Sequence, residues 1–491
     1  MTTPFPPDCT RRALKAIVPE TDESGVDLRV TPGMMYVPPS HSRALDPDHT
    51  IVQGIRGAGK SFWWKALYSK DHRRFLTAGF PSTRINASVE VFRGFGTAPL
   101  PDAYPGKDVL ASLVQTFNPR HIWQSVVGVH VALPPPFPIN SPSWEQKTLW
   151  VRDNPELYER LLVQRDQELA NSGKTSLILF DGLDRLADRW PEIRVLARPL
   201  FQLALDLRAT RAIRLKLFVR PDMLQDAEIL QFPDASKLRS VELTWKRVDL
   251  YALLFQRLGN APEGAQIRLH GEKCFSLQWQ QVLGGQEWLL PQKVRTDEDL
   301  QRRLFHAISG PTMTADPKSI KRGFPYTWLV SHLMDPFEQV SPRSFLAALE
   351  TAATSDYSAD WEYALSYRSI QTGVQNASRI RVNELVSEEY PWISHVMAPC
   401  RGQLTVPCSE SELLEVWEKQ HIMAKFDHEF LENPQAMKLP PQHLQEGLTG
   451  LLKDLVLLGI FEQMSNSRVQ MPDVYRIAFG IGRRGGVKPL K

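Results

Sequence analysis

The chain has 491 residues, which at ~150 residues per domain corresponds to roughly three domains. Hydrophobic residues make up 42% and charged residues 23% of it, as in soluble globular proteins, which excludes a mainly disordered or collagen-like chain. The 58 Lys and Arg residues against 55 Asp and Glu residues give a net charge of +3, so overall charge does not indicate a nucleic-acid partner.

No apolar run reaches the ~18 residues that a membrane span needs. The first residues also lack the apolar core of a signal peptide. We therefore expect a cytoplasmic protein without a membrane partner.

Two compositional regions precede residue 260. Residues 1–48 carry eight prolines and weak periodicity, which predicts an extended Pro-rich N-terminal arm with little regular structure. In residues 49–260, short apolar runs alternate with helix-length segments, which predicts an α/β fold with a parallel sheet sandwiched by helices. The Pro-rich stretch 98–143 predicts a long surface insertion in this core. The runs expected as strands are 50–54, 83–91, 176–180, 214–219 and 241–243.

The patterns after residue 260 are mainly helical. Residues 261–375 predict a helical lid, with helices at 325–334 and at 341–350, where Ser341 is the N-cap and Pro342 the first helical residue.

Residues 376–491 predict a winged-helix region with a basic tail. Ser409 and Glu412 form a capping-box pattern before a helix. A second helix, 442–458, is stopped by Gly459 and followed by two short runs around a 465–467 turn. A helix followed by a hairpin is the ending of a winged-helix unit.

The strongest motif is Gly54-Ile-Arg-Gly-Ala-Gly-Lys-Ser61, a complete GxxxxGK[ST] placed directly after an apolar strand and before a helical segment. The glycines let the backbone curl so that its N–H groups converge on phosphate oxygens. Lys60 supplies a positive charge to the β- and γ-phosphates, and the Ser61 hydroxyl can bind Mg²⁺. The motif predicts a nucleotide-binding P-loop.

Two carboxylates follow the apolar run 176–180. Asp181 stands at the end of this predicted strand, where a P-loop protein needs an acid to hold the metal ion. Asp184, three residues on, is a candidate for polarising the attacking water. Asp184 could instead cap the following helix, because Asp is a favoured N-cap residue.

The segment Phe180-Asp-Gly-Leu-Asp-Arg185 resembles the Walker B segment of STAND-type NTPases, especially the NACHT and origin-recognition-like branches of the AAA+ superclass. The resemblance covers residues 49–260 and implies a P-loop ATPase core. It implies that Arg220, after the strand 214–219, faces the γ-phosphate and senses the nucleotide state. It also implies a second sensor at Arg343, at the start of a lid helix. The residues alone leave open that either arginine is simply exposed.

These patterns define one predicted site with ATP and Mg²⁺ as cofactors, although the sequence shows no preference between ATP and GTP. The expected catalytic residues are Lys60, Asp181, Asp184 and Arg220, and the expected metal ligands are Ser61 and Asp181. The expected nucleotide-binding residues are Gly54, Arg56, Gly57, Ala58, Gly59, Lys60, Ser61, Phe62 and Arg343.

The predicted function is a slow ATPase switch that couples nucleotide state to self-assembly or partner recruitment. The resemblance implies a homo-oligomer, a separate effector protein and a role in anti-phage defence. Two alternatives stay open. One is a DNA-binding ATPase that uses the winged helix and the basic residues Arg483, Arg484 and Lys488, although the same tail could contact protein. The other is a binding protein that its nucleotide stabilises with negligible turnover.

Overall fold

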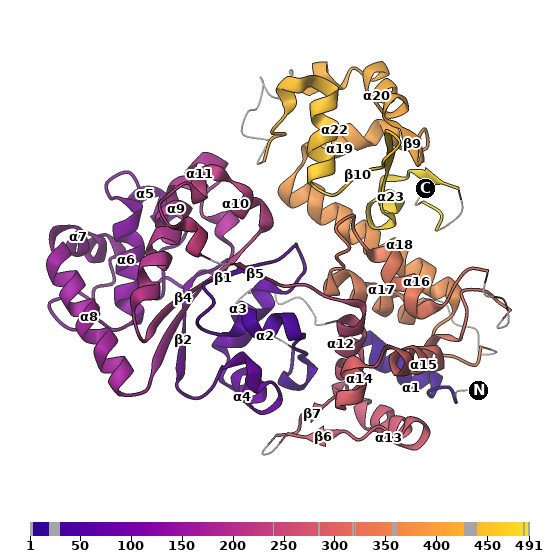
Figure 1. Ribbon diagram of the computed structural model, residues 1–491, viewed down its shortest axis with the longest axis horizontal. Coiled ribbons are helices and arrows are strands. Elements are labelled where there is room, and N and C mark those ends of the chain that lie inside the picture. Colours follow the sequence, from indigo (N-terminus) through magenta and orange to yellow (C-terminus); the bar gives the residue numbers. More distant parts are fainter. Residues whose placement is uncertain are drawn as a thin grey trace.

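The computed structural model describes residues 3–18, 30–238, 240–282, 285–316, 319, 321–355, 361–426, 439–484 and 487–489. Five parallel strands form its main sheet in the order β2-β3-β4-β1-β5 (Figure 1). The strands are β1 (Ile51–Gln53), β2 (Val89–Phe95), β3 (Thr175–Phe180), β4 (Ile213–Val219) and β5 (Ser240–Glu242). The predicted α/β fold with a parallel sheet is therefore confirmed.

Helices cover both faces of this sheet, because its strands are apolar on both sides. Leu177 and Leu179 of β3 join one hydrophobic core, while Ile178 and Phe180 join the other. The first core includes residues of α2 (Pro39–Leu45), α3 (Lys60–Tyr68) and α4 (Lys70–Gly79). The second includes residues of α5 (Lys107–Leu113), α6 (Pro119–His130), α7 (Trp144–Asp153), α8 (Pro155–Asn171) and α9 (Trp190–Asp206).

Strand β2 lies later in the chain than the sequence indicates. The expected run 83–91 begins in a 3-10 turn at Pro81–Thr83, and β2 continues to Phe95 through Gly94. A Cβ at Gly94 would overlap the Phe180 ring, and one at Gly96 would overlap the Trp64 ring. These glycines resemble turn signals in the sequence but make room for aromatic side chains.

The stretch 98–143 is not only a surface insertion. It contains α5 and α6, and Ile122 and Trp123 of α6 are completely buried. Asn118 caps α6 and Pro119 occupies its first turn, so a proline that suggested a loop begins a core helix.

The described part of the N-terminal arm also contains more regular structure than expected. It forms α1 (Pro7–Lys15) and α2, each with a proline in the first turn. Phe5, Ala13 and Leu14 are buried in the same core as α3.

The lid predicted at 261–375 consists largely of helices in the described residues. These are α13 (Gly264–Phe275), α14 (Gln292–Thr296), α15 (Glu298–Ser309), α16 (Pro325–Leu333), α17 (Pro342–Thr354) and α18 (Tyr367–Glu384), preceded by α12 (Arg247–Asn260) and joined by the hairpin β6 (Gln280–Gln281) and β7 (Trp288–Leu289). Helices α17 and α18 pack so closely that a Cβ at Gly373 would overlap the Ala348 carbonyl. Helix α18 supplies Val374 to the first core, which continues from the sheet into the lid, and Val382 to a separate core in the C-terminal region.

The C-terminal region is a winged-helix unit, as predicted. Its strands β9 (Cys408–Ser409), β10 (Glu462–Gln463) and β11 (Arg468–Gln470) form an antiparallel sheet in the order β10-β11-β9. Its helices are α19 (Trp392–Met397), α20 (Glu410–Lys419), α22 (Gly447–Leu457) and α23 (Asp473–Phe479). The capping box of Ser409 and Glu412 is present at the start of α20.

Short elements lie between these helices and strands. They are α10 (Pro221–Gln225), α11 (Ala227–Leu230), and the parallel pair β8 (Thr405–Val406) and β12 (Gly482–Arg483). Within the described ranges, no helix is long and apolar enough to cross a bilayer.

Candidate functional site

The P-loop connects β1 to α3. Gly57 and Gly59 have φ of +77° and +111°, in the region that L side chains rarely adopt, so the curl of this loop depends on glycine. Lys60 is the first residue of α3, and its Nζ donates hydrogen bonds to the carbonyls of Gly54 (2.6 Å) and Ile55 (3.1 Å). The ammonium group therefore lies within the loop that would surround a phosphate.

The indole of Trp245 also holds this loop in place. Ala58 is buried, and its carbonyl accepts a 2.8 Å hydrogen bond from the Trp245 indole N–H. Phe62, expected to touch the nucleotide, is half-buried and packs edge-to-face on Trp63, with ring centroids 5.0 Å apart. The following Trp63 and Trp64 are buried core residues.

Asp181 lies at the carboxyl end of β3, beside the start of α3. Its side chain accepts a hydrogen bond from Ser61 and lies near the Lys60 charge, which both favour the ionised carboxylate. Burial has the larger effect and raises the pKa of Asp181 above its ordinary value. A buried carboxylate beside a serine hydroxyl is the donor set that Mg²⁺ prefers in P-loop proteins, so these residues fit the expected metal ion.

Asp184 and Arg220 lie close together beyond the carboxyl ends of the neighbouring strands β3 and β4. Asp184 lies in a 3-10 turn at Leu183–Arg185, and its carboxylate is 3.6 Å from the Arg220 guanidinium. It does not cap helix α9, whose N-cap is Arg189. Arg220 is not a surface arginine, because its side chain is only 13% exposed and also pairs with Asp222 at 2.8 Å.

The start of the lid helix α17 lies against the P-loop. A Cβ at Gly57 would overlap the Ser341 hydroxyl and would lie 3.4 Å from the Arg343 Cβ. Ser341 occupies the predicted N-cap position without a side-chain cap hydrogen bond, and Pro342 begins the helix as predicted. The structure thus brings Arg343 beside the loop that contains Lys60.

Glu384, which sequence reasoning missed, connects the lid to the P-loop. This last residue of α18 pairs with Arg343 at 2.6 Å and with Arg56 at 3.5 Å. Its side chain is only 17% exposed. One carboxylate therefore neutralises two arginines that the sequence predicts to face the nucleotide.

Two more missed residues come from the boundary between lid and winged helix. Arg381 donates a 3.2 Å hydrogen bond to the Arg56 carbonyl. The Tyr390 hydroxyl lies 3.4 Å from the Arg220 guanidinium and 3.3 Å from the Asp222 carboxylate. No motif indicates these residues, because their partners lie 168 to 325 positions away in the chain.

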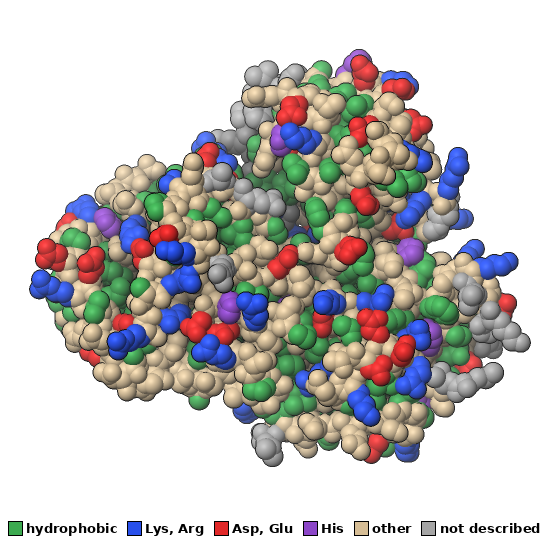
Figure 2. All heavy atoms as spheres, viewed as in Figure 1, with side chains coloured by type: hydrophobic (Ala, Val, Ile, Leu, Met, Phe, Trp, Pro, Cys, Tyr) green, Lys and Arg blue, Asp and Glu red, His purple; other side chains and the backbone are tan. Residues whose placement is uncertain are grey.

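Two of the predicted DNA-contacting residues, Arg483 and Lys488, lie beside α23 and α18. Arg483 pairs with Asp473 at 3.2 Å, and the Lys488 carbonyl accepts a hydrogen bond from Gln375, while the Arg483, Arg484 and Lys488 side chains are exposed. Residues 376–491 contain 13 Lys and Arg against 14 Asp and Glu, and Lys453 of α22 pairs with Glu446 at 3.0 Å. Figure 2 shows positive and negative side chains interspersed over the drawn face of the molecule. Phosphate-backbone binding normally uses a basic surface, so the winged helix has a weak electrostatic basis for it.

The fold and these contacts define a P-loop NTPase core followed by a helical lid and a winged-helix region. Among solved structures, the chain is similar to the ORC2 protein of Aeropyrum pernix in its ADPNP-ADP complexes, with 12% identity over 93% of this chain and 94% of that one and a TM-score of 0.39. It is also similar to Cdc6p of Pyrobaculum aerophilum, with 12% identity over 93% and 95% of the two chains and a TM-score of 0.28. No protein-family model and no curated protein sequence matches the chain.

Proposed function

We propose that this protein is an ATP-dependent switch. The observation that carries the proposal is the arrangement of Lys60 and Ser61 at the start of α3 beside the buried Asp181 at the end of β3. These residues supply the cation, the hydroxyl and the carboxylate that binding of a nucleoside triphosphate with Mg²⁺ requires. Mg²⁺ would supply charge neutralisation at the phosphates, with Ser61 and Asp181 as its protein ligands.

The lid contacts suggest how the nucleotide is sensed. In the structure, the Glu384 carboxylate occupies the space between Arg56 and Arg343. A γ-phosphate is a competing anion for the same two guanidinium groups, and it carries more negative charge than a carboxylate. Binding of a triphosphate would therefore weaken the contacts of Glu384 and bias α18 away from the P-loop.

A second contact couples the same event to the winged helix. Tyr390 reaches Arg220 and Asp222 from the beginning of that domain. If Arg220 turns toward the γ-phosphate, it leaves Tyr390, and this attachment of the winged helix is reduced to the hydrogen bond with Asp222. Two arginine-centred contacts would then be released together, which is the property of a switch rather than of a static binding site.

The proposal includes slow hydrolysis of ATP to ADP and phosphate. Asp184 lies beside Arg220, where it can orient a water molecule once the arginine has turned away. Loss of the γ-phosphate would return Arg343 to Glu384 and restore the contacts seen in the structure.

We also propose that the released surface assembles with further copies of the chain or recruits an effector protein. Near-neutral charge over residues 376–491 favours a protein partner for the winged helix over duplex DNA. A role in anti-phage defence rests on the STAND resemblance of Phe180–Arg185 alone.

The test measures mass in solution and ATP turnover for the wild type and Lys60→Ala, each with and without ATP·Mg²⁺ and duplex DNA. We expect an ATP-dependent change of mass or turnover that disappears in Lys60→Ala. Stimulation by duplex DNA would instead support the DNA-binding ATPase. A stabilising effect of ATP without turnover or mass change would support the nucleotide-stabilised binding protein and contradict the switch.

A further inference from the structure

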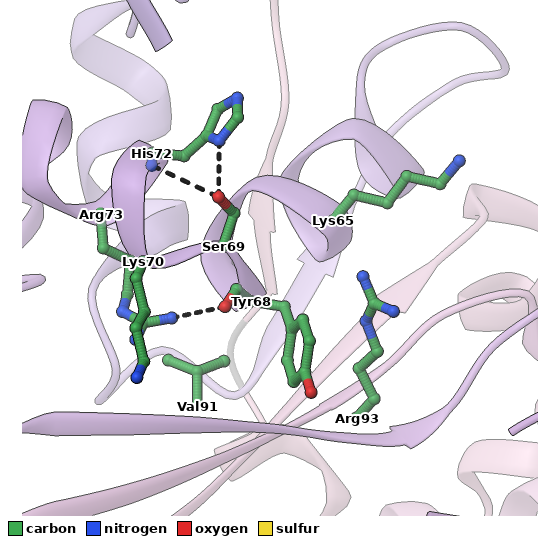
Figure 3. A pocket seen from close by; sticks show the side chains of 8 residues that line it. All are labelled: Lys65, Tyr68, Ser69, Lys70, His72, Arg73, Val91 and Arg93. Carbon is green, nitrogen blue, oxygen red and sulfur yellow. Dashed lines mark hydrogen bonds between the residues drawn. The ribbon is translucent and has the colours of Figure 1, made fainter. Parts of the chain in front are cut away.

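A cavity lies on the sheet face covered by α3 and α4, at the edge of the sheet formed by β2. Its volume is about 480 Å³, within the ~300–1,000 Å³ typical of small-molecule sites. Figure 3 shows the eight residues that line it, which come from α3, the α3–α4 junction, α4 and β2. On α3 the cavity is lined by Lys65 and Tyr68, which follow Lys60 by about 7.5 and 12 Å along the helix, so the cavity lies toward the end of α3 that is farther from the P-loop.

The walls of this cavity are strongly cationic. Lys65, Lys70, Arg73 and Arg93 all line it, and none of its described lining residues is acidic. Within the described ranges, neither Lys65 nor Lys70 forms an ion pair, unlike Lys107, Lys174, Lys237 and Lys453. Four cations around one cavity repel each other unless an anion lies between them.

The remaining lining residues hold these cations in place. The Arg93 guanidinium lies over the rings of Trp64 and Tyr68, at 4.3 Å and 4.1 Å from their centroids. Arg73 donates hydrogen bonds to the carbonyls of Leu67 (2.7 Å) and Tyr68 (2.8 Å) at the end of α3. Figure 3 shows the Tyr68 ring beside Arg93 in this wall. Both arginines are thus fixed before any ligand arrives, which lowers the entropic cost of binding.

His72 and Ser69 do not add charge to the site. The Nε2 of His72 lies 2.8 Å from the Val30 carbonyl, and its Nδ1 lies 2.8 Å from the Ser69 hydroxyl. Burial lowers the pKa of His72, so the ring is neutral at physiological pH. The positive charge of the cavity therefore comes from the two lysines and the two arginines.

We propose that this cavity binds a phosphate group, either of a small phosphorylated molecule or of a nucleic-acid strand. Arginine matches phosphate oxygens through its planar fork of N–H donors, and lysine supplies a mobile positive charge. Both kinds of cation line the same cavity, with no acid among its described residues to oppose the ligand. The proposal does not depend on nucleotide binding at the P-loop.

The test is calorimetric titration of pyrophosphate and, separately, of a short oligothymidine into Lys60→Ala, which removes phosphate binding at the P-loop. The matched control is Lys60→Ala with Lys273→Gln and Lys293→Gln added. We expect both proteins to bind pyrophosphate, with an affinity that falls as the salt concentration rises. In the test variant, Lys65→Gln and Lys70→Gln are added to Lys60→Ala. Pyrophosphate should bind this variant at least about tenfold more weakly, because two charge-assisted contacts are lost. Lys273 and Lys293 are exposed lysines outside the cavity.

The two probes distinguish the sources of the phosphate. An equal loss of pyrophosphate and oligothymidine binding would support a nucleic-acid strand, and loss of pyrophosphate binding alone would support a small ligand. Equal affinities of the Lys65/Lys70 variant and the control for both probes would overturn the proposal, as would no binding to Lys60→Ala at low salt. When Lys65→Gln and Lys70→Gln are introduced into the wild type, ATP-dependent turnover and mass change should be unchanged. The phosphate-binding proposal and the switch proposal can therefore fail independently.

Discussion

The sheet side and the lid side of the phosphate site hold their polar groups in different ways. On the sheet side, Lys60, Ser61 and Asp181 are placed by backbone geometry, at the start of α3 and the end of β3. On the lid side, Arg343 and Glu384 are placed by ion pairs between side chains. Backbone geometry persists in every state of a folded domain, whereas an ion pair can be exchanged for another anion. In the proposed switch, recognition and signalling would therefore depend on different sides of one site.

The largest loss of activity is expected when the buried carboxylate of Asp181, on the sheet side, is removed. In Asp181→Asn we expect turnover to fall by about a hundredfold or more, because the metal ligand is lost. The nucleotide-free protein should unfold at an equal or higher urea concentration at neutral pH, since a raised pKa means that the ionised form of Asp181 opposes folding there.

Turnover assays and urea unfolding would check both parts of this prediction. Asp206→Asn is the control, because Asp206 is an exposed carboxylate paired with Arg120. Wild-type turnover in Asp181→Asn would show that the sheet side does not bind the metal through this residue.

Substituting the glycine that lies between the two sides tests whether they are in contact. Gly57→Ala should lower the free energy of unfolding by about 2 kcal/mol, because φ is positive there and the new Cβ overlaps Ser341. Gly173→Ala is the matched control, with a positive φ but open space around its Cβ, and should cost about 1 kcal/mol. Adding Ser341→Ala to Gly57→Ala should recover the difference, and denaturant titrations of the four proteins would measure it.

Neutralising Glu384 should release the lid side without harming the sheet side. We expect Glu384→Gln to bind ATP about tenfold more tightly, because Arg56 and Arg343 no longer have a competing carboxylate. Equilibrium nucleotide binding would measure the effect. Glu415→Gln, an exposed residue of the winged-helix region, should bind like the wild type. Weaker ATP binding by Glu384→Gln would mean that Glu384 positions the arginines for the nucleotide instead of competing with it.

The smallest effect is expected at the winged-helix contact. Tyr390→Phe removes the hydroxyl that reaches Arg220 and Asp222, which is worth about 1 kcal/mol of domain contact. Proteolysis between lid and winged helix should accelerate about fivefold in the absence of nucleotide. The control is Tyr363→Phe, a half-buried lid tyrosine whose hydroxyl has no hydrogen bond to the described residues. An unchanged rate of proteolysis would show that the Tyr390 hydroxyl does not attach the winged helix to the rest of the protein.

Sequence patterns predict the sheet side well because it depends on local spacing. The expected strand 176–180 begins one position later than β3 and ends at the same residue. The P-loop lies between β1 and α3, as its motif requires. The exception is β2, where Gly94 and Gly96 accommodate aromatic rings from elsewhere in the fold. Contacts of this kind leave no periodic trace in the strand that makes room for them.

The lid side could be predicted only in part. A start of helix α17 at Pro342 follows from a capping pattern, but the ion pair of Arg343 with Glu384 joins residues 41 positions apart on different helices. Likewise, no local signal shows that α6 is buried or that Arg220 meets Tyr390, because both depend on how distant elements pack. Whether these residues sense nucleotide stays a prediction.

The length of helix α18 determines how far a small movement beside the P-loop would displace the winged helix. Its 18 residues measure about 27 Å, and its two ends belong to different hydrophobic cores. Close packing at Gly373 ties its first half to α17, so the pair turns as one piece. A tilt of only about 10° at the lid would then move the far end by about 5 Å, as in a lever arm. A winged helix at the end of such a lever is displaced by roughly the width of a polypeptide strand, enough to uncover or hide a whole surface.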